Sequence, residues 1–473
     1  SDAVAGAELQ RLSQPIPDQQ PVNKAPKGRL LNILGVGFGL AGAVGGTIGA
    51  GILRTPGLVA AQLPSAELVL AAWLAGGLYA LLGAVCIAEL AAALPKAGGW
   101  YVYAERAFGK RVGFLVGWTD WLAHCIGLAW VATTVGEYGQ ALLPATIPQE
   151  PYMARILALL AIGLFSLIQL RGLRAGSASQ ELLSLAKAVA FLALVAACFL
   201  LPIQAAPAIA VPPPAPMAIA GWRSLSLAVV LALQAVITTY DGWASPVYFA
   251  EEFSEPGRDL PRSLIGGVLA VLVLYLLINL ALLHVLPLPL LASSPLPAAL
   301  AARALAGPLG GLLITALALV SLLGLINTVV MAAPRILFGL SRDGLLPSFV
   351  AQVNGGGTPS AALLLTSAAA AALVLAGSFE RLLTMGAVLY VSLPLAGIAS
   401  LVTLRQREPE LPRPFLTWGY PVSPLLITAV SLAFLIGSTA NDWLSSLAAL
   451  ALVAMGYGVC LLAERRPIAE ETS

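Results

Sequence analysis

The residues of this chain that could bind a small molecule lie in two interrupted apolar segments. The first contains Gly46-Thr-Ile-Gly-Ala-Gly51, followed by Pro56. Each glycine costs a helix about 1 kcal/mol relative to alanine, so this run favours a break, although small residues also allow close helix packing in membranes. The second segment, Ile237-Thr-Thr-Tyr-Asp-Gly-Trp-Ala-Ser-Pro246, is interrupted by an acid, a glycine and a proline.

A broken helix exposes groups that suit a zwitterion. The N-terminus of a half-helix offers free N–H groups and a positive dipole to a carboxylate, and the freed carbonyls accept from an ammonium. The two breaks lie about 190 residues apart. Paired interruptions in corresponding positions of two halves indicate an inverted-repeat transporter with its site at the bilayer midplane.

Three charged residues near these breaks are further candidates. Lys187 lies six residues into an apolar segment. Its side chain either extends to the cytoplasmic surface or remains in the membrane as a functional charge. Loss of water disfavours an ammonium, so Lys187 could also carry a coupled proton. Arg54 and Asp241 could form an ion pair that gates the pathway or binds a polar side chain. Alternatively, Asp241 caps the second half-helix and Arg54 reaches extracellular water.

The remaining polar residues of the apolar segments receive no functional assignment. Glu89, Asp120 and Glu137 are expected to be solvated or structural at span ends, and His124 and His284 have no metal-like spacing. Four cysteines inside apolar runs, without a CxxC pair, indicate packing rather than a disulfide, a metal or redox chemistry. We therefore expect no metal site, no cofactor and no catalytic residue.

The composition requires a membrane around these elements. Of 473 residues, 59% are hydrophobic and 10% are charged, with a mean hydropathy of +0.89, whereas soluble chains carry about 25% charged residues. The net charge of +2 gives no basic field for nucleic acid. No phosphate loop, nucleotide fingerprint or nucleophile motif is present, so neither a nucleotide partner nor an enzyme is indicated.

Proline, glycine and charge divide the chain into twelve apolar segments, each near the length of about 20 residues that spans a bilayer. They lie near residues 32–60, 67–93, 112–141, 153–171, 180–202, 224–252, 262–287, 309–340, 360–378, 381–404, 421–439 and 443–463. The stretch from Pro287 to Pro308 is too broken to span and could carry a short helix near Pro297 to Ala306. The fold class predicted is an all-α membrane protein.

Charge also predicts the orientation and the ends. Most of the 25 lysines and arginines fall on the side shared by both termini, which places that side in the cytoplasm. Residues 1–31 lack the apolar core of a signal peptide and are expected to form a flexible cytoplasmic tail, with a second tail at 464–473. Residues 32–404 would form the transport core, with inverted repeats at about 32–202 and 224–404. Residues 405–463 would form two additional C-terminal helices.

With these residues in view, the chain resembles the amino acid/polyamine/organocation superfamily, in its cationic and L-type amino acid exchanger branch. Gly46-Thr-Ile-Gly-Ala-Gly-Ile52 is similar to the family's unwound first helix, and Leu94-Pro-Lys-Ala-Gly-Gly-Trp-Tyr-Val-Tyr103 to its first cytoplasmic loop. Tyr240-Asp-Gly-Trp243, followed by Glu251-Glu252, resembles the sixth helix and the loop after it. Arg335-Ile-Leu-Phe338 with Arg342-Asp-Gly344 resembles the end of the eighth.

The resemblance implies a leucine-transporter-type fold of five plus five inverted helices with two more at the C-terminus, and helices 1 and 6 unwound at the midplane. It also implies a carboxylate site on the amides around Gly49 to Gly51 and an ammonium site at the carbonyls near Thr238 to Tyr240. The candidate substrate-binding residues are Thr47, Ile48, Gly49, Ala50, Gly51, Thr238, Thr239, Tyr240, Asp241 and Gly242.

Two departures from the family pattern bear on gating. Ala50 stands where the family often has serine, which removes a hydroxyl but keeps the amides. Thr238 stands where many members have an aromatic gate, so Tyr240 or Trp243 could serve as the gate instead. Arg54 and Asp241 are the other gating candidates. A lysine at the place of Lys187 occupies or borders the sodium site of sodium-coupled relatives, which implies no sodium requirement.

The function expected is sodium-independent secondary transport of amino acids across the plasma membrane by alternating access. The mode would be exchange or proton symport, with membrane lipid as the surroundings. A polyamine or amine transporter is the first alternative. A sensor with a transport fold, or a subunit that needs a partner, is the second.

Overall fold

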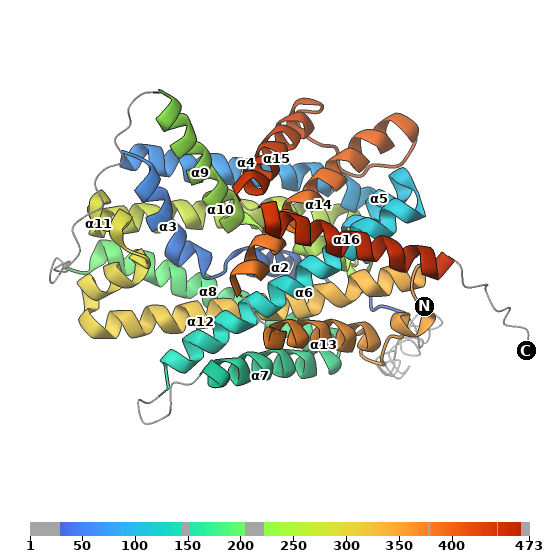
Figure 1. Cartoon of the computed structure of the whole chain (residues 1–473), viewed down its shortest axis with the longest axis horizontal. Coiled ribbons are helices and arrows are strands. Elements are labelled where there is room, and N and C mark those ends of the chain that lie inside the picture. Colours follow the sequence, from blue (N-terminus) through green and yellow to red (C-terminus); the bar gives the residue numbers. More distant parts are fainter. Residues whose placement is uncertain (1–28, 144–150, 204–221, 377–378, 442, 465–473) are drawn as a thin grey trace, which may run out of the picture.

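The protein is described by a computed structural model that covers residues 29–143, 151–203, 222–376, 379–441 and 443–464. Nearly all of these residues are helical (Figure 1). The helices are α2 (Val36–Thr47), α3 (Gly51–Gln62), α4 (Ala66–Ala93), α5 (Trp100–Phe108), α6 (Lys110–Ala141), α7 (Pro151–Leu170), α8 (Leu173–Leu200), α9 (Trp222–Tyr240), η1 (Ser245–Glu252), α10 (Pro256–Val285), α11 (Leu288–Ser293), α12 (Pro297–Arg342), η2 (Ser348–Ala351), α13 (Ser360–Ala376), α14 (Phe379–Arg407), α15 (Val422–Asn441) and α16 (Trp443–Glu464).

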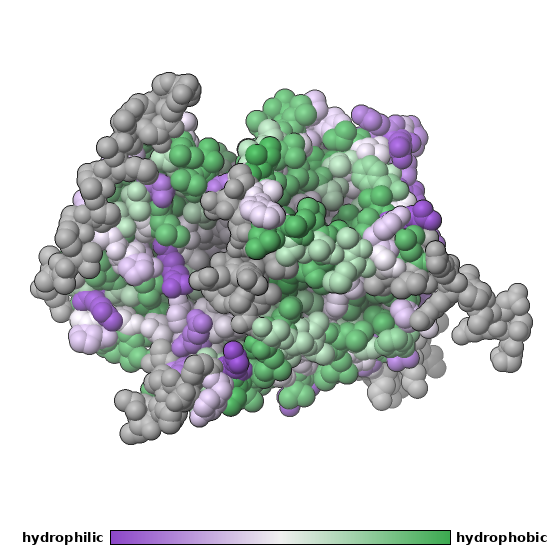
Figure 2. Space-filling view, in the orientation of Figure 1, coloured by the Kyte–Doolittle hydropathy of each residue, from purple (hydrophilic) through white to green (hydrophobic). Residues whose placement is uncertain are grey.

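The lengths and hydropathies of these helices suit a bilayer. In the described part of the chain, eight helices are long and apolar enough to cross a membrane, and the bent pair α2 and α3 makes a ninth candidate span. Shorter apolar helices lie in α13, α15 and α16. Hydrophobic residues cover most of the coloured surface in Figure 2. The chain is therefore a multi-pass helical membrane protein, as its composition predicts.

The two interrupted segments are breaks between helices. α2 ends at Thr47 and α3 begins at Gly51, with a bend of 49° between the two. α9 ends at Tyr240, and the 3₁₀ helix η1 follows from Ser245. Between them Gly242 has a φ of +101°, a left-handed conformation that glycine adopts without strain. The glycine, proline and acid pattern of the sequence thus coincides with both breaks.

Elsewhere the structure refines the sequence-based boundaries. The short helix expected near Pro297 is present as the first part of α12, which is interrupted by non-helical backbone at Ala306 and Gly307. α11 precedes it within the broken stretch. The segment taken as the first cytoplasmic loop contains the helix α5, which begins after two glycines with positive φ, Gly98 and Gly99. The tails expected at 1–31 and 464–473 lie almost wholly outside the described residues.

Packing places both breaks at the centre of the molecule. α2 packs against α8 and α10, α3 packs against α9, and η1 contacts α2, α10 and α12. α6 packs against α12 and α14 and completes the surroundings of the breaks. α3 and α11 lie toward one end of the molecule and α5 toward the other (Figure 1).

Candidate functional site

The two breaks touch each other through glycine. A Cβ added at Gly46 would lie 2.6 Å from the carbonyl oxygen of Gly242, so a side chain there would displace the second break. The hydroxyl of Tyr275 lies 3.1 Å from the carbonyl oxygen of Thr47 and 3.2 Å from that of Thr239. These contacts hold the C-terminal end of α2 beside the C-terminal end of α9.

A cavity of about 670 Å³ opens next to the breaks. Every candidate substrate-binding residue of the sequence except Ile48 lines it, as do Arg54 and Trp243. Its walls also include Leu58 of α3, Leu231 of α9 and Phe434 of α15. We call this space the central cavity.

Three backbone amides of residues that line the cavity have no partner among the described residues. The N–H groups of Gly49, Ala50 and Gly51 donate to no oxygen in the described part of the chain. They precede and begin α3, where free N–H groups and the helix dipole favour an anion. A Cβ at Gly51 would lie 3.5 Å from Thr239, in ordinary van der Waals contact with this residue of α9.

Lys187 lies behind the first break and does not line the cavity. Its side chain is fully buried, and Nζ donates to the carbonyl oxygens of Gly45 (3.0 Å), Ile48 (2.8 Å) and Ser321 (3.1 Å). All three ammonium donors are therefore used. Two of the acceptors stand at the C-terminal end of α2, where a positive charge is favourable. This geometry contradicts the alternative in which Lys187 reaches toward the membrane surface.

Arg54 and Asp241 line the same cavity, but they are not paired in this conformation. Among the described residues no ion pair joins them, and both side chains are exposed to the cavity. Asp241 does not cap η1, because the N-cap of η1 is Ala244 and no side chain caps this helix. Either charge is thus available to a ligand.

The two aromatic gate candidates are both packed. Tyr240 is 1% exposed, and its hydroxyl donates to the carbonyl of Trp73 at 3.2 Å. Trp243 is 7% exposed and meets Trp100 edge-on, with 6.4 Å between ring centroids. A gating role for either would require it to leave these contacts.

Sequence reasoning missed a polar group on the cavity wall. His124 lines the central cavity, and its Nδ1 lies 3.0 Å from the carboxylate of Asp120. Asp120 is completely buried inside α6, so its expected place at a span end was wrong, and of the two expected roles, solvated or structural, it has the structural one. The spacing of four residues between the two was the available signal, since it puts them on one helix face. Tyr390 of α14 also lines the cavity.

A family model described as amino acid permease matches residues 34–459. The chain belongs to this family of transporters. The serine/threonine exchanger SteT of Bacillus subtilis is 28% identical over 86% of this chain and 90% of its own length. The human large neutral amino acids transporter small subunit 2 is 28% identical over 83% of this chain and 73% of its own. The mouse Asc-type amino acid transporter 1 is 29% identical, over 83% and 74%.

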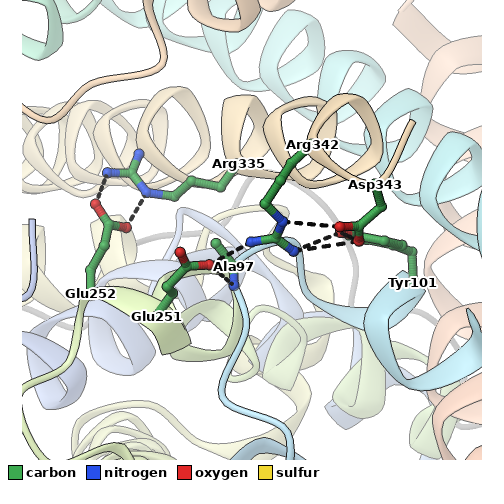
Figure 3. A network of polar contacts seen from close by, with 7 residues as sticks. All are labelled: Ala97, Tyr101, Glu251, Glu252, Arg335, Arg342 and Asp343. Atoms are coloured by element: carbon green, nitrogen blue, oxygen red, sulfur yellow. Dashed lines mark hydrogen bonds and ion pairs between the residues drawn. The ribbon is translucent and has the colours of Figure 1, made fainter. Parts of the chain in front are cut away.

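Polar contacts join α5, η1 and the C-terminal end of α12 at one end of the permease, which we call the closed end. Figure 3 shows its polar network. Arg335 forms a bidentate ion pair with Glu252 at 2.5 and 2.8 Å, and both side chains are buried. Arg342 pairs with Glu251 at 2.5 Å and with Asp343 at 3.0 Å. Both acids of η1 are thereby tied to α12.

The network continues to α5. Tyr101 donates to Asp343 at 2.8 Å, and the backbone amide of Ala97 donates to Glu251 at 3.2 Å. Burial alone would raise the pKa of Asp343, but the bonds from Arg342 and Tyr101 outweigh it and hold the pKa below its usual value. The carboxylate therefore stays ionised at neutral pH.

Glu89 of the permease is structural rather than solvated. It is fully buried, pairs with Arg405 at 2.5 Å and Arg413 at 3.2 Å, and accepts from the amide of Thr417 at 2.7 Å. It thus ties α4 to α14 and to the segment after α14. The ring centroids of His284 and Phe199 lie 5.0 Å apart, and His284 is not among the residues that line the cavity.

Proposed function

We propose that this permease exchanges neutral amino acids across the plasma membrane, without sodium, by alternating access. The observation that carries this proposal is the central cavity, in which the free amides of Gly49 to Gly51 lie beside the C-terminal end of α9. The carboxylate of the substrate binds these amides, and the ammonium of the same substrate binds the carbonyls near Thr238 to Tyr240.

The fold proposed is twelve spans in a five plus five inverted repeat with two more C-terminal helices. The first and sixth spans are the broken pairs α2 with α3 and α9 with η1, unwound at the midplane. Both termini are cytoplasmic, so the closed end faces the cytoplasm and the central cavity faces outward. Support comes from the coincidence of the twelve apolar segments with helices and from the basic residues near the closed end.

Neutral substrates are favoured by the relatives, whose names specify serine, threonine and large neutral amino acids. Exchange is favoured because one of them is named an exchanger. Sodium independence rests on Lys187, which holds a positive charge among three carbonyls where a cation would otherwise bind. Proton symport is the alternative mode, with Lys187 as the proton carrier.

A second candidate function is transport of amines or polyamines. It is favoured by Asp241, a carboxylate in the cavity without an ion-pair partner among the described residues. In that case Asp241 binds a second ammonium, and the amides of α3 stay unused.

The test is uptake of radiolabelled L-threonine into vesicles that contain only this purified chain. Exchange predicts rapid uptake into vesicles loaded with L-threonine and slow uptake into empty ones. Competition by L-threonine methyl ester, in which the carboxylate is blocked, should be weak. Strong competition by the ester or by putrescine would favour the amine function, and no uptake without a second protein would favour a partner-dependent subunit.

A further inference from the structure

A continuous chain of hydrogen bonds runs from the wall of the central cavity to η1. Nδ1 of His124 lies 3.0 Å from Oδ1 of Asp120 and 2.9 Å from the Asp120 carbonyl oxygen. The hydroxyl of Tyr248, on η1, donates to the same Oδ1 at 3.0 Å. Nε1 of Trp100, on α5, donates to the Tyr248 hydroxyl at 3.0 Å. The buried carboxylate of Asp120 thus joins α6 to η1, and Trp100 extends the chain of bonds to α5.

The geometry fixes the direction of each bond. Both acceptors near His124 require Nδ1 to carry a proton, which leaves Nε2 as the ring atom without a partner among the described residues. Tyr248 accepts from Trp100, so its own proton goes to Asp120. The ring centroids of His124 and Tyr248 lie 5.0 Å apart, edge to face. The chain therefore has one free end, at the cavity.

Asp120 depends on both donors. Its side chain has no exposure to solvent, and Oδ2 has no hydrogen-bond partner in the described structure. A buried carboxylate that loses a donor is destabilised, because no water replaces the lost bond. If η1 moves and takes Tyr248 with it, Asp120 keeps only His124.

We propose that Asp120 is a positioning residue that latches η1 to α6, and that a substrate contact at His124 releases the latch. The proposal rests on the exchange function proposed above. A substrate donor, its ammonium or a side-chain hydroxyl, bonds Nε2 of His124 and makes Nδ1–H a stronger donor to Asp120. The occupied carrier can then lose the Tyr248 bond at lower cost than the empty carrier.

This latch gives a physical reason for obligatory exchange. In the empty protein, opening of the closed end strands Asp120, so an unloaded carrier rarely changes conformation. In the loaded protein, the stronger His124 bond compensates. The ion pairs of Glu251 and Glu252 lie on the same helix as Tyr248. Release of Tyr248 therefore loosens the element that carries them.

The first test compares Tyr248→Phe with Tyr103→Phe, a buried tyrosine of α5 whose hydroxyl makes no hydrogen bond to a described residue of η1. The readout is the ratio of L-threonine uptake into loaded and empty vesicles. We expect Tyr248→Phe to lower this ratio about two- to tenfold, as loss of one buried hydrogen bond implies, by raising uptake into empty vesicles. Tyr103→Phe should leave the ratio unchanged. A Tyr248→Phe variant in which both uptakes fall in proportion would overturn the proposal.

The second test does not depend on transport. Ala250 on η1 is fully buried, so Ala250→Cys, in a chain with its four native cysteines replaced by alanine, reports opening of the closed end. In lipid nanodiscs, Tyr248→Phe or Trp100→Phe should speed labelling by a polyethylene-glycol maleimide about two- to tenfold. L-threonine should speed it in the parent but not in His124→Phe. Equal rates in parent and variants would refute the latch, whereas faster labelling without any L-threonine uptake would refute only the exchange function.

Discussion

Replacement of Lys187 by alanine tests how the first break is held together. The variant removes the ammonium but leaves the carbonyls of Gly45 and Ile48 at the C-terminal end of α2, where the helix has no further N–H groups to offer. A buried acceptor without a partner costs about 1 to 3 kcal/mol. Two such acceptors destabilise the binding conformation by at least about 2 kcal/mol, which lowers its population about 30-fold.

The assay is L-threonine binding and vesicle uptake with sodium, potassium or choline as the external cation. We expect the parent protein to transport equally in all three, because the ammonium already neutralises the carbonyl cage. Lys187→Ala should bind at least about 30-fold more weakly, whereas Lys110→Ala, at an exposed lysine, should behave as the parent does. Strict sodium dependence of the parent, or full activity of Lys187→Ala, would refute this reasoning.

Three further predictions concern the cavity and the closed end. Gly51→Leu should weaken amino acid binding at least about tenfold, because the leucine side chain fills the carboxylate position. Gly37→Leu, at a position where a Cβ meets nothing within 4 Å, should leave binding unchanged. Thermal-shift titration of the purified proteins with an amino acid measures both affinities. Glu252→Gln should lower the unfolding temperature more than the double change Glu252→Leu with Arg335→Met, because the single change leaves the buried charge of Arg335 unpaired, at a cost of about 3 to 5 kcal/mol. Arg106→Gln, which breaks an exposed ion pair, should have little effect on the unfolding temperature. Arg54→Gln and Asp241→Asn should have additive effects on binding to this conformation, where the two are unpaired, and a coupling energy above about 1 kcal/mol in a double-mutant cycle would contradict that.

The parts of the fold that local sequence determines could be predicted. Glycine clusters and proline weaken helices wherever they occur, so the breaks after Thr47 and Tyr240 were visible in the sequence, and so were most of the cavity residues that flank them. Ile48 is the exception. A break does not say which way each residue faces, and this residue gives its carbonyl to Lys187 rather than its side chain to the cavity.

Long-range pairing could not be predicted in the same way. Asp120 meets Tyr248 across 128 residues, and Glu89 meets Arg405 across 316. Nothing in the sequence near either acid indicates these distant partners, so the sequence left open whether each acid is solvated or structural. For Lys187, likewise, both depth and reach were compatible with the membrane surface, and only the carbonyls contributed by α2 and α12 decide its position.

The placement of charge suggests how one fold can be both closed and ready to open. Buried ion pairs such as Arg335 with Glu252 add little net stability, because desolvation offsets much of their attraction, but breaking one partner away is costly. Such contacts therefore separate two discrete arrangements instead of allowing gradual deformation. In this permease they join η1 to α12, and Asp120 joins the same helix to α6. The short helix η1, after the second break, is thus bonded to α12 on one side and to α6 on the other, and each of these bonds is either intact or broken. Under the latch proposed above, contact of a substrate with His124 at the cavity wall shifts the balance between the two arrangements through Asp120.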